Sequence, residues 1–498
     1  MSKKYFSRVF LLFLPLLLAS CSKWLDVNTD PNNPSDVAPE LVLPVAQASV
    51  AGVIGGEFAI LGGIWSQHWT QSHTSSQYKT YDAYDIDATD LNVQWTEMYA
   101  GGLNDLETIK KQSAEASEWN IYLQATVLQV YGYQLFADFF DKIPFTEALK
   151  GVAVPNPVFD DGQVVYDGLI ARLDDALGKD FSASTVKQAS TDLVFGSEGL
   201  DEQVAQWKRF ANTLKLKIYL RQSESSRGGA ALAAISAMYA AGAEFLSSDA
   251  SIAQFVDEAN RSNPLYETNV RQLNTDGNLR LSRTLESFLK ENGDLARLDG
   301  LFRPDINNPA LIGLVQGNFE APTTTIPVGT IAIATFSPTT PFFFISEDES
   351  YFLQAEALLR IGRSASEVKA MYDAATEASY AKFGFAFDPA MIGAGGVYEF
   401  PAGGSMAEML EAIIVQKWVA MVNQGYESFL DQARTGYPRI SPVPAADANY
   451  IAGQWTYSLG GVTGGLFPKR FLFPSSSSDV NTNTPAVVPV TTKVWWMP

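Results

Sequence analysis

Apolar residues recur every three or four positions along much of the chain, which is the spacing of one face of an α-helix. This pattern predicts helices over residues 95–110, 119–139, 163–177, 201–221 and 230–241. Another helix is expected from about Pro39 to Ala51, followed by a glycine-rich segment, Gly52–Gly63, that is either flexible or closely packed. The best strand candidate is Val328–Phe336, which is rich in Ile, Val and Thr.

Ser-x-x-Glu capping boxes indicate further helix starts at Ser346, Ser364 and Ser405. One residue separates Gly362, where the first of these helices should end, from Ser364, so the two helices are expected to form an antiparallel hairpin. Alanines on their faces are typical of tetratricopeptide-like hairpins, although no strict 34-residue repeat is legible. The predicted fold is therefore predominantly all-α: tetratricopeptide-like helical hairpins forming a superhelical scaffold, with a loop-rich lobe and few short strands.

Two segments lack helical periodicity, residues 251–341 and 438–498. Both are expected to be loop-rich insertions within a single helical domain that spans residues 39–498. The second segment ends in Val494-Trp495-Trp496, and such a tail stays ordered only if its tryptophans dock on the helical body.

The N-terminus resembles a bacterial lipoprotein signal. A basic start precedes an apolar run, Val9 to Leu18, that is too short to span a bilayer. Leu18-Ala19-Ser20 then precedes Cys21, the only cysteine in the chain and at the position where lipidation needs it. We expect a signal peptide over residues 1–20, lipidation at Cys21 and an extended tether over residues 21–38. A plain signal peptide with an incidental cysteine is the alternative.

The charge and the apolar runs of the chain limit the kinds of binding partner that we expect. The formal net charge of −20 argues against a nucleic-acid partner, because nucleic-acid phosphates are bound mainly by Lys and Arg side chains. After the leader, no stretch approaches the ~20 continuous apolar residues of a membrane span. Membrane attachment is therefore expected only through the lipid on Cys21. Because that lipid would occupy the only thiol, the core must hold the fold without a disulfide.

The most unusual stretch mixes aromatic rings with amide and hydroxyl groups and contains both histidines. Rings can cover the apolar C–H face of a sugar while amides meet its hydroxyls. The predicted ligand-binding residues are Trp65, His68, Trp69, Gln71, Tyr78, Tyr81 and Tyr84. The alternative is a core element in which Trp65 and Trp69 pack inward. The three tyrosines, in an aspartate-rich context, are expected to be exposed.

The sequence contains no recognisable catalytic or metal-binding motif. The sequence has no Gly-x-Ser-x-Gly elbow, phosphate-binding loop or His-Glu-x-x-His helix. The aspartates at 82, 85, 87 and 90 could offer oxygen ligands to Ca²⁺ but lack the glycine and terminal glutamate of an EF-hand. We therefore expect that the protein is not an enzyme and that it has no cofactor or metal site. Two alternatives stay open: a surface-anchored glycan hydrolase, needing two carboxylates about 5–9.5 Å apart, and a helical scaffold that binds no ligand.

Short passages over most of the chain match one family in the same order. They are Cys21 with residues 25–34, then residues 137–148, 210–217, 354–362, 416–420 and 433–438. Together they resemble the SusD/RagB nutrient-binding outer-membrane lipoproteins, in the subgroup with Gln416-Lys417-Trp418 and Arg434-Thr435-Gly436-Tyr437-Pro438. The chain departs from the family pattern at Asp141-Lys142, where a glycine is more usual, and at Ala433, which replaces an arginine.

The resemblance implies four tetratricopeptide-like hairpins and a lipoprotein on the outer face of a Bacteroidetes-type outer membrane. It implies a partner, a SusC-like TonB-dependent transporter, over which the lipoprotein sits as a lid. It also implies a ligand, an oligosaccharide in the best-known members and a peptide in others. The expected function is capture of that ligand at the cell surface and its delivery to the transporter.

Overall fold

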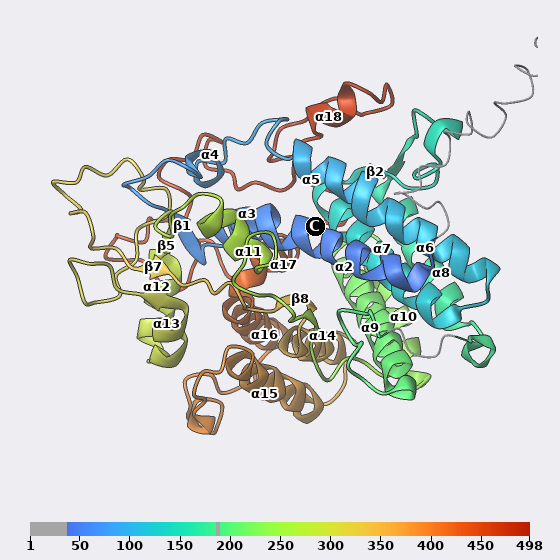
Figure 1. The fold of residues 1–498 in the computed structure, drawn as a ribbon. Coiled ribbons are helices and arrows are strands. Elements are labelled where there is room, and N and C mark those ends of the chain that lie inside the picture. The colour runs from blue at the N-terminus through green and yellow to red at the C-terminus, as the bar shows by residue number, and fades with distance from the viewer. Residues whose placement is uncertain (1–36, 186–189) are drawn as a thin grey trace, which may run out of the picture.

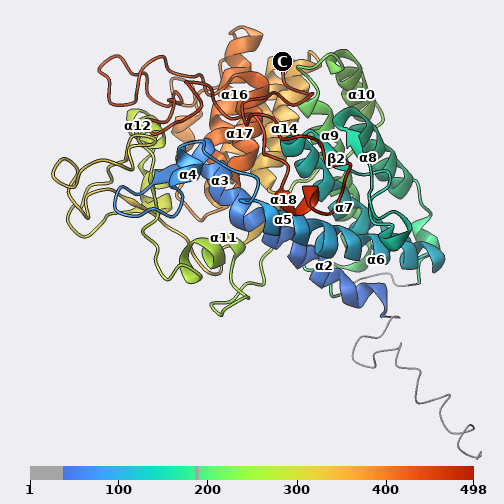
Figure 2. The same cartoon turned by 90° about the horizontal axis from the view of Figure 1, so that it is seen from above.

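The fold is predominantly α-helical, as the apolar pattern predicts (Figures 1 and 2). The computed structural model describes residues 37–185 and 190–498. The predicted signal peptide, the lipidation site Cys21 and the tether up to residue 36 lie outside the described residues.

The first half of the chain forms the helical body drawn in blue to green in Figure 1. Its helices are α2 (Pro39–Val53), α3 (Ala59–Trp65), α4 (Lys79–Asp82), α5 (Asn92–Glu97), α6 (Asn104–Glu115), α7 (Trp119–Phe140), α8 (Gly162–Leu177), α9 (Leu200–Arg221) and α10 (Gly228–Ala240). Short connections join α6 to α7 and α9 to α10, so each pair packs as a helical hairpin.

The second half adds further helices beside this body (Figure 1). They are α11 (Pro264–Tyr266), α12 (Arg283–Glu291), α13 (Leu295–Leu301), α14 (Glu347–Arg360), α15 (Ala365–Ala381), α16 (Met406–Ala420), α17 (Gly425–Thr435) and α18 (Ser475–Ser478). Helices α14 and α15 form the hairpin expected from the single residue between Gly362 and Ser364.

Two of the three predicted capping boxes form. At Ser364 and Ser405, the hydroxyl accepts from the backbone N–H three residues on, and the glutamate there accepts from the serine N–H. The box predicted at Ser346 is wrong, because Glu349 is drawn into the core instead. There its carboxylate accepts from Lys217 Nζ at 2.9 Å. A buried ion pair has therefore overridden a local capping preference.

The strands are few and short. One antiparallel sheet has the order β1 (Trp69–Gln71), β5 (Leu279–Leu281), β7 (Ile333–Ala334), β6 (Phe302–Arg303). Two further pairs are β2 (Lys142–Pro144) with β3 (Phe159–Asp161), and β4 (Ala250–Ile252) with β8 (Phe342–Ile345). The strand predicted over 328–336 shortens to β7, since Gly329 adopts a φ of 78° that leaves the extended region.

The C-terminal tail docks on the helical body. The sequence predicts that the tail is ordered only if it docks in this way. Trp496 is buried in the main core, and the ring of Trp495 packs edge-on against Tyr166 with centroids 4.9 Å apart. Further back in the tail, Phe471 stacks on Phe139 of α7 with ring centroids 4.0 Å apart. The tail is therefore part of the core rather than an appendage.

The glycine-rich segment is closely packed rather than flexible. It lies within a continuous helical run, Pro39–Trp65, which is long and apolar enough to cross a membrane. However, 78% of the most apolar window of that run is buried within the protein, as expected of a core helix. Gly62 and Gly63 in α3 meet Gly425 and Tyr426 at the start of α17, so the two backbones approach without intervening side chains.

Replacing Gly62 by alanine is expected to destabilise the protein by about 1–3 kcal/mol. The added Cβ would overlap the backbone of Tyr426, which a rotamer change cannot relieve. Gly52→Ala is the matched control, because nothing lies within 4 Å of a Cβ there. That variant should gain about 0.5–1 kcal/mol, since alanine favours the helix. Urea unfolding measures both variants, and equal stabilities would contradict the close approach.

Candidate ligand-binding site

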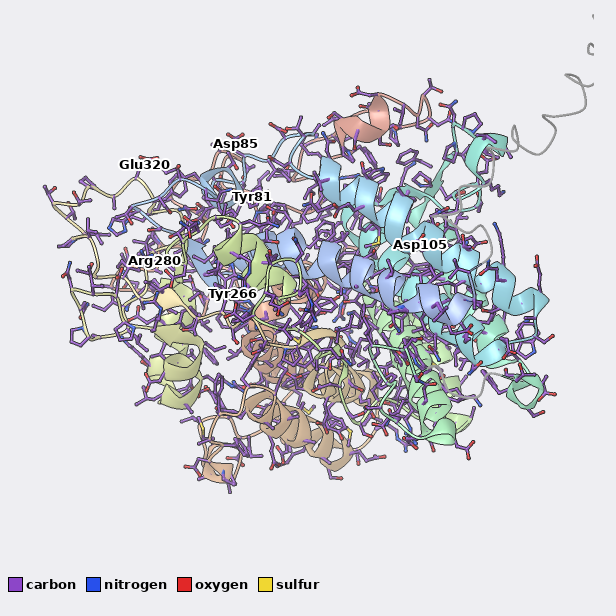
Figure 3. All side chains as sticks on the ribbon, viewed as in Figure 1. Tyr81, Asp85, Asp105, Tyr266, Arg280 and Glu320 are labelled. Atoms are coloured by element: carbon purple, nitrogen blue, oxygen red, sulfur yellow. The ribbon has the colours of Figure 1, made fainter. Side chains whose placement is uncertain are left out.

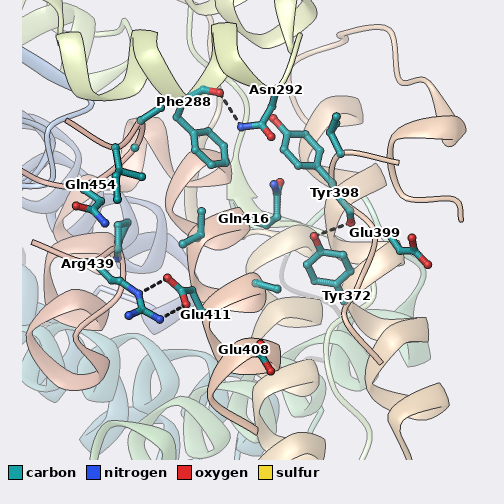
Figure 4. A pocket seen from close by; sticks show the side chains of 17 residues that line it. Phe288, Asn292, Tyr372, Tyr398, Glu399, Glu408, Glu411, Gln416, Arg439 and Gln454 are labelled. Carbon is teal, nitrogen blue, oxygen red and sulfur yellow. Dashed lines mark hydrogen bonds and ion pairs between the residues drawn. The ribbon is translucent and has the colours of Figure 1, made fainter. Parts of the chain in front are cut away.

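A cavity of about 330 Å³ opens between α12, α15, α16 and the loop segments 397–399, 438–439 and 451–454 (Figure 4). Its walls combine aromatic rings, carboxamides and charged groups. The lining residues that carry this chemistry are Phe288, Asn292, Tyr372, Tyr398, Glu399, Glu408, Glu411, Gln416, Arg439 and Gln454. They come from segments that are far apart in the sequence and meet only in the fold.

The aromatic wall is held from several sides. Phe288 and Tyr398 lie nearly parallel, with ring centroids 6.0 Å apart and planes 8° apart. The hydroxyl of Tyr398 donates to Asp294 Oδ2 at 2.9 Å, and that of Tyr372 donates to the Tyr398 carbonyl at 2.9 Å. Burial raises the pKa of both tyrosines above the ordinary value, so both stay neutral. Gly453, with a φ of 81°, brings its backbone against Phe288.

Carboxamides supply unused hydrogen-bonding groups. Gln416 is only 3% exposed; its Oε1 accepts from Arg297 Nη1 at 3.2 Å, which leaves Nε2 to donate. Asn292 Nδ2 donates to the Phe288 carbonyl at 2.8 Å, which leaves Oδ1 to accept. The side-chain amide of Gln454 forms no hydrogen bond to any residue in the described ranges. Figure 4 shows Asn292 and Gln416 pointing towards the centre of the cavity.

The charged groups are ordered as well. Arg439 and Glu411 form a bidentate pair, with both N–O distances at 2.6 Å (Figure 4). Hydrogen bonds from the backbone N–H and hydroxyl of Ser405 lower the pKa of Glu408, so this carboxylate is ionised at neutral pH. A second hollow of about 410 Å³ adjoins the cavity and shares Asn292 and Val397 with it.

The seven residues predicted to bind the ligand lie elsewhere, in the core. Their side chains are 0–7% exposed: Trp65, His68, Trp69, Gln71, Tyr78, Tyr81 and Tyr84. The expectation that the three tyrosines are exposed is wrong. The burial matches the alternative in which the stretch packs inward, and ligand binding by these residues stays a prediction that the variants discussed below decide.

Hydrogen bonds inside the protein satisfy several polar groups of this stretch, whereas the buried hydroxyls of Tyr78 and Tyr84 have no hydrogen-bond partner among the described residues. Trp65 Nε1 donates to the Tyr81 carbonyl at 3.1 Å, and Trp69 Nε1 donates to the Ile60 carbonyl at 3.2 Å. His68 Nε2 bonds the Trp418 carbonyl at 2.7 Å, and burial lowers the pKa of His68 to about 3, so the ring is neutral. The mixed chemistry that suggested a site therefore serves a hydrogen-bonded core.

The stretch nevertheless stands behind the cavity. The His68 ring stacks on Trp418 with centroids 5.9 Å apart, and Trp418 packs edge-on against Phe288 at 5.7 Å. Trp418 therefore links the buried stretch to the cavity wall. His68 thus packs in the layer behind the cavity wall.

Two aspartates of the 82–90 run, Asp82 and Asp85, have different environments in the fold. Asp82 is buried and accepts from Gln71 N at 2.9 Å and Gln316 Nε2 at 2.6 Å. Burial raises its pKa to about 6. Asp85, by contrast, is exposed and lies at the upper edge of the molecule in Figure 3, above Tyr81. Across the described ranges, no group of three His, Cys, Asp or Glu side chains is placed to hold a metal ion.

Sequence reasoning missed the cavity residues because no single stretch contains them. Phe288 and Asn292 lie in the irregular 251–341 segment, and Gln416 is the first residue of the Gln416-Lys417-Trp418 motif. Two signals were usable: the irregular 251–341 segment, which is the alternative place for the site if residues 65–84 do not bind, and that motif, in which a polar residue precedes two core residues on an otherwise apolar helix.

A family model described as "Starch-binding associating with outer membrane" matches residues 31–455. The chain belongs to this SusD-like family. None of the curated protein sequences compared with it matches. The SusD/RagB resemblance seen in the short passages is thereby confirmed.

Solved structures show the same fold for this SusD-like protein. A SusD homolog from Bacteroides uniformis is 21% identical, with a TM-score of 0.73 over 93% of this chain and 100% of that one. A chitin-binding SusD homolog from Flavobacterium johnsoniae is 20% identical, with a TM-score of 0.71 over 92% and 97%. A SusD/RagB family protein from Bacteroides thetaiotaomicron is 20% identical, with a TM-score of 0.70 over 93% and 99%.

Proposed function

We propose that this SusD-like protein captures an oligosaccharide, or a peptide, in the cavity of Figure 4. The observation that carries this proposal is the set of unused amide groups beside a pinned aromatic wall, formed by Gln416, Asn292 and Gln454 with Phe288 and Tyr398. A sugar ring presents an apolar C–H face to aromatic side chains and hydroxyls to amides. A peptide would use its carbonyl and N–H groups in the same way.

The family supports the same class of ligand. Its description names starch binding, and one similar structure is that of a chitin-binding homolog. Capture would involve no chemistry: hydrogen bonds from Ser405 lower the pKa of Glu408, which makes it a poor general acid, and Glu411 is locked to Arg439. A bound oligosaccharide should therefore be recovered intact.

The place of action would be the surface of the outer membrane. The family description associates its members with that membrane, and Leu18-Ala19-Ser20-Cys21 is the predicted lipidation site. We propose that the lipoprotein faces the cell exterior and delivers its ligand to a SusC-like TonB-dependent transporter. Co-purification of a β-barrel transporter with the tagged lipoprotein from membranes tests that partnership.

Replacing Gln454 by alanine is expected to weaken ligand binding roughly two- to tenfold, the effect of losing one hydrogen bond of about 0.5–1.5 kcal/mol. Isothermal titration with a malto-oligosaccharide and a chito-oligosaccharide provides the measurement. Gln163→Ala is the matched control, since Gln163 is an exposed glutamine on α8 away from the cavity. If both sugars and a mixed peptide library fail to bind the wild type, the proposed function is wrong.

Replacing Cys21 by alanine should release the protein from membranes. Each acyl methylene contributes about 0.8 kcal/mol when buried, so durable anchoring needs the chains attached at this residue. Labelling with a radioactive fatty acid, followed by fractionation of cells, measures both lipidation and attachment. A wild-type protein that takes up no label would show that the cysteine is incidental.

A further inference from the structure

Carboxylates dominate the charge around the cavity and the adjoining hollow. The acidic lining residues are Asp294, Asp388, Glu399, Glu408 and Glu411. Arg439 is the only basic residue among the lining residues of these two hollows. A ligand that enters this space therefore meets an excess of negative charge.

Two of these carboxylates are already neutralised. Glu411 is held in the bidentate pair with Arg439, and Asp294 lies 3.5 Å from Arg297 Nη1 while also accepting from Tyr398. The other three, Asp388, Glu399 and Glu408, have no Lys or Arg within 4.0 Å among the described residues. The uncompensated charge is thus concentrated on three side chains.

Each uncompensated carboxylate is held by one oxygen and keeps the other free. Asp388 Oδ1 accepts from Ala390 N at 2.9 Å, Glu399 Oε2 from Gly395 N at 2.7 Å, and Glu408 Oε2 from Ser405 N at 2.7 Å. Backbone hydrogen bonds restrict these side chains before any ligand arrives. The second oxygen of each remains available to accept from a charged donor, which makes a stronger hydrogen bond than a neutral one.

Groups other than carboxylates also point to a ligand. Gln416, 97% buried, directs an unpaired Nε2 donor into the cavity, and the Phe288 and Tyr398 rings present π-faces that attract cations. A sugar with a free amine fits all of these features. Its ring lies against the aromatic wall, its hydroxyls meet the amides and its ammonium faces the free carboxylate oxygens.

We propose that this cavity selects oligosaccharides that carry a protonated amino group, such as glucosamine units, over neutral and acidic ones. This inference rests on the proposed function of the same cavity and names the ligand class within it. Acidic sugars are disfavoured because their carboxylates would face Glu399 and Glu408 without a free cation to meet them.

The test compares β-1,4-linked glucosamine pentamer, its N-acetylated form and an oligogalacturonate by isothermal titration of the mature protein. At about pH 5.5 the sugar amine is protonated and ordinary carboxylates remain ionised. The amine form should bind about tenfold more tightly than the acetylated form at low salt, and most of this advantage should vanish at about 1 M NaCl, where screening is strong. The oligogalacturonate should bind more weakly than either.

Substitution of single carboxylates tests which residues cause the selectivity for the amino group. Glu399→Gln and Glu408→Gln should each weaken binding of the amine form about three- to fivefold and leave the acetylated form nearly unchanged. Glu377→Gln is the matched control, because Glu377 is an exposed glutamate of α15 that lines neither hollow. Thermal melting of each variant separates an effect on binding from one on folding.

The possible failures are distinguishable. Equal affinity for the amine and acetylated forms would overturn the charge selectivity while leaving ligand capture in the cavity intact. Absence of binding by every sugar would instead overturn the proposed capture of oligosaccharides. Tighter binding of tetralysine than of the glucosamine pentamer would overturn the assignment to an amino sugar, since the carboxylates would then serve a basic peptide.

Discussion

Replacing Arg434 by methionine should lower the free energy of unfolding by about 3–5 kcal/mol, the typical result of removing one partner of a buried ion pair. Arg434 is buried at the end of α17, where its guanidinium forms a bidentate pair with Glu356 and donates to Asp431 Oδ1 at 2.9 Å. Methionine keeps most of the packing but leaves both carboxylates without this partner. Chemical unfolding at neutral pH measures the loss.

The pH dependence of this variant gives a second signature. Burial alone would raise the pKa of Glu356, but Arg434 and Arg360 outweigh it and lower the pKa to about 2. A depressed pKa contributes stability that is present above the unfolded value of about 4.3 and is lost as pH falls towards 2. Without Arg434 that pKa must rise, so the stability deficit should shrink as the medium is acidified and Glu356 becomes neutral.

Arg363→Met is the matched control for this prediction. Arg363 pairs with Glu367 on the surface of α15, and its side chain is exposed. Exposed pairs contribute about 0–1 kcal/mol, so this variant should unfold nearly as the wild type does. Equal losses for the two arginine variants would show that the buried pair has no special role.

The Trp65→Ala variant should lose about 3–5 kcal/mol of stability and keep its affinity for ligand. Trp65, the last residue of α3, is buried against α17 and the C-terminal tail, where its ring lies 5.0 Å from that of Phe429 and 5.5 Å from that of Phe471. Truncation opens a cavity in the core without touching a residue that lines the proposed site. Urea unfolding and isothermal titration of the same preparation provide the two readouts.

The Gln454→Ala variant should give the opposite pattern, with weaker binding and nearly unchanged stability. A Trp65→Ala protein that melts like the wild type but binds poorly would show that the ligand binds at residues 65–84 instead. Trp69→Ala and Tyr81→Ala extend the comparison, since both side chains are buried in the same core.

Much of the fold followed from the sequence because its helices are long and strongly periodic. Helices predicted over 119–139 and 163–177 correspond to α7 and α8 within a residue at each end. Local rules failed where a long-range contact outweighed them. Glu349 left its predicted cap to pair with Lys217, whose position 132 residues away gives no signal in the local sequence.

The site was far less accessible to prediction. Residues 65–84 have the composition of a sugar-binding surface, yet the seven predicted side chains are buried, and hydrogen bonds such as that from Trp65 to the Tyr81 carbonyl satisfy several of their polar groups. Composition alone does not distinguish a wet aromatic surface from a hydrogen-bonded interior. The cavity depends instead on Phe288, Gln416 and Gln454, which only the tertiary arrangement brings together.

The stacking of Phe471 on Phe139 constrains when the core of this protein can close during folding. Residues 139 and 471 are far apart in the sequence, and Trp496 of the same tail also enters the core. The hydrophobic surface around α7 therefore stays uncovered until synthesis of the chain has passed these residues. A nascent chain that stops before Phe471 would therefore present this surface to chaperones and proteases.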